Sequence, residues 1–325
     1  MSEKIDSLWI AGASGLVGSA LARFYRKKKI RLLTPSRSEL DLTSQVDVEK
    51  WMEVNNPSHI IMAAGTVGGI GANHNRPAEF ISDNIIMARN VIHSAFKQRI
   101  EKLVYLGSSC IYPKEAEQPI KETSLLTGTL EPTNEPYAIA KIAGLKMCES
   151  YRSQYKSNFV AAMPCNIYGV GDTYHAQNSH VIPAMILKLH DAKIKNLAEI
   201  EVWGTGDVLR EFMWSGDLAR ALDVIMRDYN DLEHINIGSG EEISIKKLVK
   251  LIAKVVGYQG DIVFNPDHPD GVKRKIVDNT KITALGWRPQ MHLKEGLEKS
   301  YNDFLERRIY ETAFEQNKTG DTVWR

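Results

Sequence analysis

Tyr137 and Lys141 are the two residues whose types and spacing most directly suggest chemistry. They stand four positions apart on a helix predicted to begin after Pro136, so the phenol and the amine share one helical face. A tyrosine is a poor acid–base catalyst near neutral pH, because the ordinary pKa of a phenol is about 10. A neighbouring ammonium stabilises the phenolate, and such a pair can move a proton to or from a substrate oxygen. Taken alone, the same spacing fits an ordinary amphipathic helix.

The segment LGSSCIYP, which follows the fourth predicted strand, adds hydroxyl groups and a thiol. Ser108 is suited to hydrogen-bond a substrate oxygen alongside Tyr137, where a carbonyl gains or loses hydride. Cys110 follows two residues later, and a free cysteine is more often a small buried apolar residue. Loops at the carboxyl edge of a parallel sheet are, however, where ligands bind. The sequence therefore favours a catalytic set of Ser108, Tyr137 and Lys141, with Cys110 beside it.

Three glycines spaced three apart, Gly12, Gly15 and Gly18, lie between a predicted strand and a predicted helix. Glycine is needed where a tight turn requires unusual backbone angles and where a side chain would keep a pyrophosphate from the helix N-terminus. A merely glycine-rich turn is the alternative. The position directly between strand and helix favours dinucleotide binding.

The end of the second predicted strand indicates which dinucleotide is bound. An acidic residue there would hydrogen-bond the ribose 2′-hydroxyl of NAD. This chain has Arg37, whose permanent charge and planar guanidinium suit a 2′-phosphate, so NADP(H) is favoured over NAD(H). A solvated surface arginine is the alternative, and the nearby Glu39 and Asp41 weaken the preference.

These residues must be positioned by an α/β fold. In the first half of the chain, short β-rich runs alternate with helical patterns, which predicts a Rossmann-type, doubly wound parallel sheet with helices on both faces. The predicted strands cover residues 7–11, 30–34, 59–64, 102–107 and 159–163. From about residue 165, turn-rich segments separate helices near 181–192, 216–228 and 244–256. We therefore expect a nucleotide-binding domain over 1–164, a smaller, interleaved α/β substrate-binding lobe over 165–310 with some segments returning to the first domain, and a polar tail over 311–325.

Composition excludes several classes of protein. The 325 residues carry a formal net charge of +1, with 43% hydrophobic and 25% charged residues, as in ordinary globular proteins and unlike polybasic nucleic-acid binders. Three cysteines without a CxxC spacing suggest neither a disulfide framework nor a zinc site. No signal-peptide pattern precedes the first predicted strand, and no apolar run reaches the roughly 20 residues of a membrane span. We expect a cytoplasmic protein that binds neither nucleic acid, membrane nor metal.

A series of longer motifs narrows the interpretation. In order, over nearly the whole chain, these are GASGLVGSA, MAAGTVGGIGAN, LGSSCIYP, GTLEPTNEPYAIAKIAGLKMCESY, NSHVIPA, VWGTG with LREF, and PDGVKRK. With them the chain resembles the GDP-L-fucose synthases, the GDP-4-keto-6-deoxy-D-mannose 3,5-epimerase/4-reductases of the extended short-chain dehydrogenase/reductase family. The resemblance implies an NADP(H)-dependent oxidoreductase that acts on a GDP-sugar and forms a homodimer through a helical interface.

The resemblance also implies roles for particular residues. Ser108, Tyr137 and Lys141 would be the reductase set, and Cys110 and His180 would be the epimerase acid–base pair. The implied cofactor contacts are Gly12, Ala13, Ser14, Gly15, Leu16, Val17, Gly18, Arg37, Asp41, Ala64, Leu106, Gly107, Lys141, Pro164, Asn166, Ile167 and His180. The implied substrate contacts are Ser109, Asn178, Lys188, Trp203, Arg210 and Asp270. Taken singly, His180 also fits a packing or capping histidine, Arg210 a surface charge and Trp203 a plug in the smaller lobe.

The implied chemistry suits these residue types. A 4-keto group acidifies the C–H bonds on both adjacent carbons, so a base on one face and an acid on the other can invert C3 and C5 through an enolate. Cysteine and histidine both titrate close enough to neutrality for these duties. The sequence leaves open which of Cys110 and His180 is the base.

Departures from the family pattern leave the sugar open. Ser14 stands where relatives often carry a basic residue, Lys188 stands where they carry arginine, and MWSGD follows LREF in place of LHVDD. A C4-reductase of a related GDP-4-keto sugar, such as a 6-deoxy-heptose or a 3,6-dideoxy sugar, is the first alternative. A 4,6-dehydratase fits less well, because it needs a carboxylate pair after the serine, where this chain has Cys110 and Ile111. A non-catalytic NADP-sensing protein is a further alternative, although such a protein need not keep the catalytic set.

Overall fold

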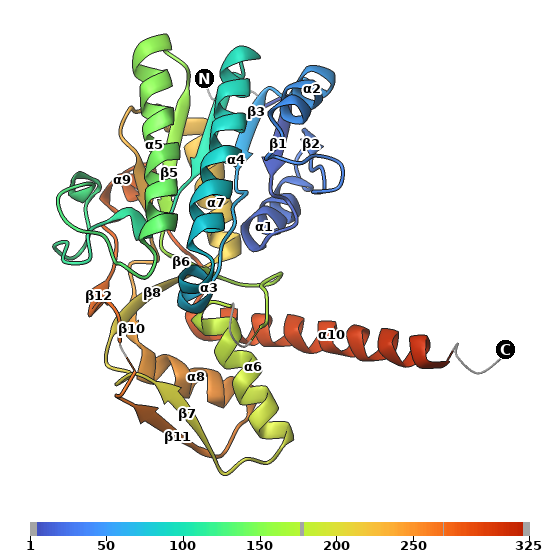
Figure 1. Cartoon of the computed structure of the whole chain (residues 1–325), viewed down its shortest axis with the longest axis vertical. Helices are drawn as coiled ribbons and strands as arrows, with labels where there is room; N and C mark the ends of the chain where they lie inside the picture. The colour runs from blue at the N-terminus through green and yellow to red at the C-terminus, as the bar shows by residue number, and fades with distance from the viewer. Residues whose placement is uncertain (1–4, 176–178, 269, 321–325) are drawn as a thin grey trace.

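The computed structural model describes residues 5–175, 179–268 and 270–320. The described chain forms two parts, with a large sheet and its helices above a smaller part in the view of Figure 1. The large sheet has six parallel strands in the order β2-β1-β3-β4-β5-β9. Their bounds are β1 Ser7–Ala11, β2 Arg31–Leu33, β3 His59–Met62, β4 Lys102–Leu106, β5 Phe159–Pro164 and β9 Ile235–Ile237.

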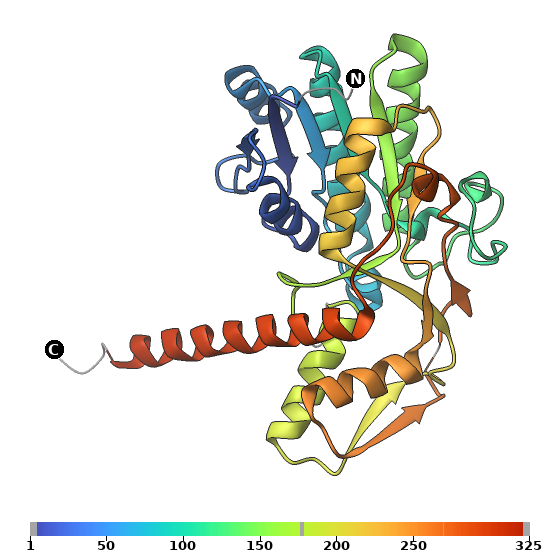
Figure 2. The same cartoon turned by 180° about the vertical axis from the view of Figure 1, so that it is seen from behind.

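Helices cover both faces of this sheet. α2, α4 and α5 pack together on one face, α1 packs against α7 on the other, and Figures 1 and 2 show the two faces in turn. Every side chain of β1, β3, β4 and β5 is buried, as a parallel sheet covered on both faces requires. The helix bounds are α1 Leu16–Tyr25, α2 Gln45–Asn55, α4 Pro77–Lys97, α5 Glu135–Tyr155 and α7 Ser215–Asp228.

The smaller part has its own apolar core. β8 is central in a four-stranded sheet with β6, β10 and β12, and β7 pairs with β11. α8 packs between α6 and α10, where Ile186, Leu189, Leu248, Ile252 and Phe304 are buried together. The bounds are β6 Asn166–Tyr168, β7 Glu199–Trp203, β8 Leu209–Trp214, β10 Glu242–Ser244, β11 Asp261–Asn265, β12 Arg274–Lys275, α6 Val181–Ile194, α8 Ile245–Val256 and α10 Leu293–Gly320. Short elements complete the chain: α3 Ile70–Asn75, η1 Ser109–Ile111, η2 Glu122–Ser124 and α9 Thr280–Ala284.

The predicted fold class is confirmed, and the five predicted strands are present as β1 to β5. The prediction of five was incomplete, because β9 adds a sixth strand that is only three residues long and shows no usable alternation. α7 and β9 both return to the large sheet from the region expected to form mainly the smaller lobe. α10 continues to Gly320, so the structure has a helix over most of the residues expected as a polar tail. Among the described helices, none combines the length and apolar character needed to cross a membrane.

Candidate active site

The glycine turn after β1 is built by close backbone packing. The φ angle of Gly12 is +88°, and a Cβ there would lie 2.6 Å from the Cα of Ala64. A Cβ on Gly18 would lie 2.0 Å from the carbonyl oxygen of Gly12. A Cβ on Gly15 would meet that oxygen at 3.6 Å, an ordinary contact. Packing therefore requires Gly12 and Gly18, whereas Gly15 keeps open the approach to α1.

The N-terminus of α1 can receive an anion. Gly15 is its N-cap and provides no side-chain hydrogen bond, and the first turn, which includes Leu16 and Val17, contains no acidic residue. Amide N–H groups of such a turn carry partial positive charge and point toward an incoming pyrophosphate. The residues present, with Ala13 and Ser14 in the turn, thus fit the pyrophosphate of a dinucleotide.

In the loop after β2, Arg37 is exposed, whereas the nearby carboxylates of Glu39 and Asp41 accept hydrogen bonds from other residues of the loop. Glu39 accepts hydrogen bonds from the Ser36 amide and hydroxyl, both at 2.7 Å. Asp41 accepts from the Thr43 amide at 2.9 Å and the Thr43 hydroxyl at 2.8 Å. These hydrogen bonds lower the pKa of both carboxyls, with a smaller contribution from Arg37 at Asp41. Because each carboxylate is held within its own turn, Arg37 is the group best placed to meet a 2′-phosphate.

The other predicted cofactor residues gather at the carboxyl edge of the large sheet, as the sequence predicts for a ligand site. Gly107 follows β4 and contacts Met163, whose Sδ would lie 2.3 Å from a Cβ at that position. Asn166 donates a hydrogen bond from Nδ2 to the Glu211 carbonyl at 2.8 Å, which ties the edge to β8. The positions concerned are Ala64 after β3, Leu106 and Gly107 at the end of β4, Pro164 at the end of β5, and Asn166 and Ile167 on β6.

Ser108, Tyr137 and Lys141 come together at this edge. Tyr137 lies in the first turn of α5, which begins beside Pro136 as predicted. The phenol makes a hydrogen bond with the Ser108 side chain, whose oxygen also accepts from the Cys110 amide at 3.2 Å. Lys141 Nζ lies 5.8 Å from the centroid of the Tyr137 ring and donates to the Leu106 carbonyl at 2.9 Å. Ser109 is buried next to this set.

Burial changes the acidity of the pair. It raises the pKa of Tyr137 well above the usual value, with a further increase from a negative charge at Cys110 and an opposing effect of the Ser108 hydrogen bond. Burial lowers the pKa of Lys141 to about 8. Tyr137 is therefore protonated at neutral pH and can donate a hydrogen bond or a proton to a substrate oxygen.

Cys110 lies half-buried in η1 and has a cationic partner. Lys275 Nζ, from β12, donates to the Cys110 sulfur at 3.5 Å. Since a negative charge at Cys110 acts on Tyr137, the thiol and the phenol belong to one cluster. The structure thus brings four predicted residues together, Ser108, Cys110, Tyr137 and Lys141, and adds Lys275.

His180 is the N-cap of α6, a helix of the smaller part. Nearby protein atoms partly desolvate the imidazole and lower its pKa, although the side chain is exposed to solvent, which limits the effect. The pairing of His180 with Cys110 stays a prediction. Asn178 lies outside the described residues.

The Arg210 side chain contacts the backbone of Asp270 and not its carboxylate. Arg210, on β8, is half-buried, and its Nη2 donates to the Asp270 carbonyl at 3.5 Å. Burial lowers the pKa of Arg210, while Asp270 and Cys110 act in the opposite direction. The Asp270 carboxylate accepts from the Thr205 amide and hydroxyl, both at 2.7 Å, and so closes the loop around Gly204. Arg210 is thus available to an anion beside Cys110, whereas the Asp270 carboxylate is already engaged.

Trp203 and Lys188 lie in the smaller part. The Trp203 side chain is 68% exposed and stacks on His268, with ring centroids 4.4 Å apart, so it is a surface platform and not a plug of the lobe. Lys188, exposed on α6, donates from Nζ to the Glu201 carbonyl at 2.5 Å. Both remain candidates for substrate contact.

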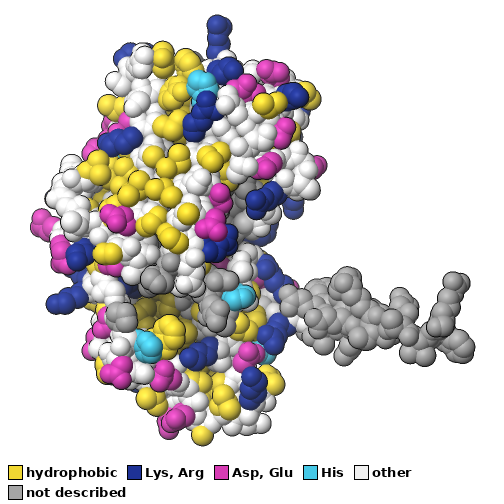
Figure 3. Space-filling model, in the orientation of Figure 1, with side chains coloured by type: hydrophobic (Ala, Val, Ile, Leu, Met, Phe, Trp, Pro, Cys, Tyr) yellow, Lys and Arg dark blue, Asp and Glu magenta, His cyan; other side chains and the backbone are white. Residues whose placement is uncertain are grey.

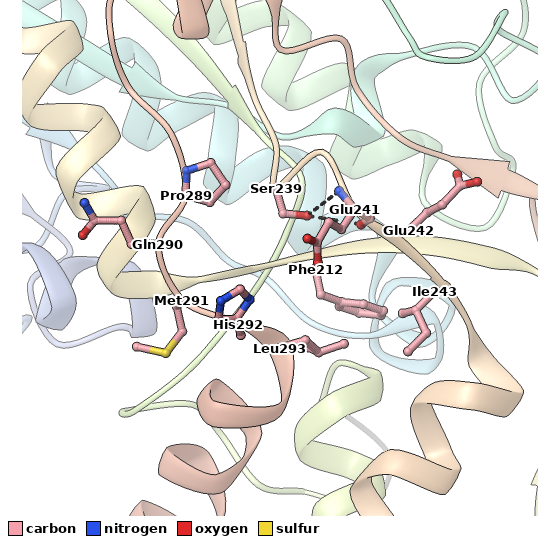
Figure 4. Close-up of a pocket in the computed structure, with 10 residues that line it drawn as sticks. All are labelled: Phe212, Ser239, Glu241, Glu242, Ile243, Pro289, Gln290, Met291, His292 and Leu293. Carbon is pink, nitrogen blue, oxygen red and sulfur yellow. Dashed lines mark hydrogen bonds between the residues drawn. The ribbon is translucent and has the colours of Figure 1, made fainter.

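Figure 4 shows a separate pocket beside the start of α10. Phe212, Ile243 and Leu293 form its apolar side, and the Ser239 hydroxyl hydrogen-bonds the backbone of Glu241 within it. None of the residues predicted from the sequence lines this pocket. The candidate site is therefore the cluster at the carboxyl edge of the large sheet.

Comparisons with known proteins agree with this geometry. The model of the NAD dependent epimerase/dehydratase family matches residues 8–238. The chain belongs to this family. It is 50% identical over 298 residues to the GDP-L-fucose synthase of Sinorhizobium fredii, covering 92% of this chain and 95% of the relative. The resemblance that the motifs indicate is therefore confirmed.

Two solved structures are similar over most of the chain. A GDP-6-OMe-4-keto-L-xylo-heptose reductase from C. jejuni gives a TM-score of 0.88 at 32% identity, covering 94% of this chain and 100% of that one. A GDP-mannoheptose C4 reductase from Campylobacter jejuni with NADP bound gives a TM-score of 0.84 at 34% identity, covering 93% and 99%.

Sequence reasoning missed two residues of the site. Lys275 is one of three basic residues in KRK, and the short strand β12 separates it from Arg274, whose side chain points to the opposite face. Glu211 is fully buried next to Arg210 and accepts hydrogen bonds from the amides of Gly240 and Val277. A glutamate in a strand gives no sign in the sequence that it will be buried.

Proposed function

We propose that this protein is a cytoplasmic, NADPH-dependent 3,5-epimerase/4-reductase that converts GDP-4-keto-6-deoxy-D-mannose to GDP-L-fucose. The observation that carries the proposal is the cluster of Ser108, Cys110, Tyr137 and Lys141 at the carboxyl edge of the sheet. A reductase of this family needs the phenol, the hydroxyl and the lysine, and the added thiol supports proton exchange at carbon. The 50% identity to the GDP-L-fucose synthase of Sinorhizobium fredii supports the substrate.

The cofactor would be held by the glycine turn, Arg37 and the edge residues described above. When bound, NADPH supplies a hydride to C4 of the sugar. Ser108 and Tyr137 hydrogen-bond the C4 oxygen, and Tyr137 gives its proton to that oxygen as the carbonyl becomes an alcohol. Lys141, buried behind the phenol, stabilises the phenolate that remains.

Epimerisation uses the same oxygen site before reduction. One member of the Cys110 and His180 pair takes the proton from C3 or C5, and the C–H electron pair moves into an enolate whose oxygen is held by Ser108 and Tyr137. The other member returns a proton to the opposite face of the carbon, which inverts its configuration. Arg210 binds the GDP diphosphate, since a half-buried guanidinium can grip a phosphate with two hydrogen bonds.

Exposed apolar side chains on α4 and α5 support a homodimer. Ile86 is 39%, Ile139 41% and Tyr155 50% exposed, and Figure 3 shows apolar side chains gathered over these two helices. Two such helix pairs can pack face to face and bury these side chains. Ile139→Glu is expected to give monomers in sedimentation velocity, whereas Val54→Glu on α2, where Val54 is 82% exposed, leaves the dimer intact. A wild-type monomer would exclude the dimer.

A C4-reductase of a related GDP-4-keto sugar is the second candidate, favoured by the similarity to two heptose reductases and by Lys188 and MWSGD near the sugar region. Proton exchange separates the two. In heavy water without NADPH, the epimerase incorporates deuterium at C3 and C5 of GDP-4-keto-6-deoxy-D-mannose, and Cys110→Ser abolishes the uptake. Absence of deuterium at both carbons would favour the simple reductase.

A further inference from the structure

In the described part of the chain, Lys275 donates a hydrogen bond to the thiol of the candidate site. Its Nζ lies 3.5 Å from the sulfur of Cys110, within hydrogen-bonding reach. The preceding residue, Arg274, pairs instead with Glu242 on β10, at 2.7 Å. Because successive side chains of a strand point to opposite faces, β12 directs one basic side chain to each side. Only one of the two therefore reaches the thiol.

The backbone around Lys275 is fixed on both sides. On one side Lys275 pairs in register with Arg210 of β8. On the other side the Ile276 amide donates to Gln118 Oε1 at 2.9 Å, and the Ile120 amide donates to the Ile276 carbonyl at 2.8 Å. Residues 118–120 belong to the segment that follows Cys110 in the chain. The strand that carries the lysine is thus bound directly to the segment that continues from the cysteine.

The buried side chain of Glu211 also holds the backbone just after Lys275. Glu211 accepts from the Val277 amide at 3.1 Å and from the Gly240 amide at 2.7 Å. The lysine side chain is half-buried, so its contact with sulfur is less screened by water than a surface pair would be. The backbone position of Lys275 is therefore set by the fold, within reach of the thiol.

The other polar side chains around Cys110, those of Tyr137 and Arg210, interact with other partners. Tyr137 is protonated and hydrogen-bonded with Ser108. Arg210 is close enough for its charge to interact with Cys110, but its guanidinium donates to the carbonyls of Leu209 and Asp270. Lys275 is thus the cation that contacts the sulfur, with Arg210 as a more distant one.

We propose that Lys275 is a positioning residue for epimerisation, which holds the Cys110 sulfur in place at the site and favours its thiolate form. A thiolate, and not a thiol, accepts a proton from carbon, and a neighbouring ammonium favours that form. The proton taken from C3 or C5 converts the thiolate to a thiol, while the C–H electron pair moves into the enolate. Lys275 keeps its own proton throughout. This role rests on the proposed function, whereas the effect on the thiol does not.

The first test measures the thiol in the free protein. Cys148 and Cys165 are buried, so iodoacetamide reports on Cys110, with Cys110→Ser as the blank. Lys275→Met is expected to slow alkylation at pH 7 by about 10-fold, and the difference is expected to shrink to about twofold near pH 9.5, where the thiol ionises without help. Lys275→Arg restores the rate, and Lys273→Met, a change at an exposed neighbour, leaves it unchanged.

The second test measures deuterium uptake at C3 and C5 with the same variants. Lys275→Met is expected to lower the uptake at pH 7 in the same proportion as alkylation, and Lys275→Arg to restore it. Equal alkylation rates in wild type and Lys275→Met would overturn the proposal, as would a loss in Lys275→Met that is the same at both pH values, because misfolding alone explains it. If alkylation changes as expected but wild type takes up no deuterium, the proposed function fails while the Lys275 effect on the thiol stands.

Discussion

The ammonium of Lys141 lies 5.8 Å from the centre of the Tyr137 ring and is anchored by a 2.9 Å hydrogen bond to the Leu106 carbonyl at the end of β4. The lysine is therefore tied to the sheet edge and not to the phenol oxygen, and it acts on the phenol mainly through charge. Burial lowers the pKa of Lys141 to about 8, so the ammonium form still predominates at neutral pH. The pair is thus arranged to support a phenolate only while a proton is being transferred.

Replacing Tyr137 by Phe removes the proton donor and leaves the packing of the ring against Phe80, whose centroid is 6.2 Å away. We expect NADPH oxidation in the presence of substrate to fall by about 100-fold or more. Deuterium uptake at C3 and C5 should fall too, because the same phenol holds the enolate oxygen. NADPH binding, followed by the quenching of tryptophan fluorescence, should not change. A Tyr137→Phe enzyme with wild-type turnover would remove Tyr137 from the mechanism.

The glycine turn has two requirements, which substitutions at Gly18 and Gly15 test separately: close backbone packing at Gly18 and open space for the cofactor at Gly15. Gly18→Ala places a Cβ 2.0 Å from the Gly12 carbonyl oxygen, so we expect the free energy of unfolding to fall by about 1–3 kcal/mol. Gly15→Ala meets only an ordinary contact at 3.6 Å and should leave stability unchanged while weakening NADPH binding. Denaturant unfolding and NADPH titration of both variants provide the check. Equal loss of stability in the two variants contradicts the assignment.

Arg37 is expected to select NADPH over NADH. With Arg37→Ala, the KM for NADPH should rise by about 10-fold or more, while the KM for NADH changes little, because NADH has no 2′-phosphate for the guanidinium to bind. Lys29→Ala, at an exposed position before β2, serves as the control for loss of one surface charge. If the two cofactors are affected equally, the 2′-phosphate is bound elsewhere.

Glu211 should make stability depend on pH. Burial raises its pKa to about 7 against opposing hydrogen bonds from the backbone, compared with about 4.3 in an unfolded chain. Since the folded state binds this proton more tightly, the stabilisation is complete below the unfolded pKa and is lost as pH rises through about 7. Glu211→Gln should therefore reduce the fall in unfolding free energy between about pH 4.5 and 7.5 by roughly 1–3 kcal/mol. Glu101→Gln, at an exposed position, should keep the wild-type slope, and an unchanged slope in Glu211→Gln would contradict the account.

Local patterns were sufficient to predict much of the fold and part of the site. β1 to β5 are apolar runs next to turns and helices, and the glycine turn and the Tyr137 helix are contiguous in the chain. β9 was missed because a strand of three residues is too short to show an alternation of apolar and polar residues. The packing of α7 on the large sheet depends on contacts with α1, which no local pattern encodes.

The side chains of the site also divide into those that local sequence places and those that contacts between distant segments place. Ser108 and Cys110 directly follow β4, and Tyr137 lies on α5, the helix that leads into the next strand of the sheet, β5. The fold class places these two segments at the same edge of the sheet, which brings the side chains together. Lys275 comes from a part of the chain 165 residues away from Cys110, and a two-residue strand determines its direction. Contacts of that kind require the tertiary structure.

Product analysis tests the central claim most directly. Purified protein is incubated with NADPH and GDP-4-keto-6-deoxy-D-mannose in heavy water, and the sugar is assigned by NMR. The proposed enzyme yields GDP-L-fucose with deuterium at both C3 and C5. A GDP-sugar that is reduced at C4 but keeps the original configuration and hydrogen at both carbons would contradict the epimerase half of the account.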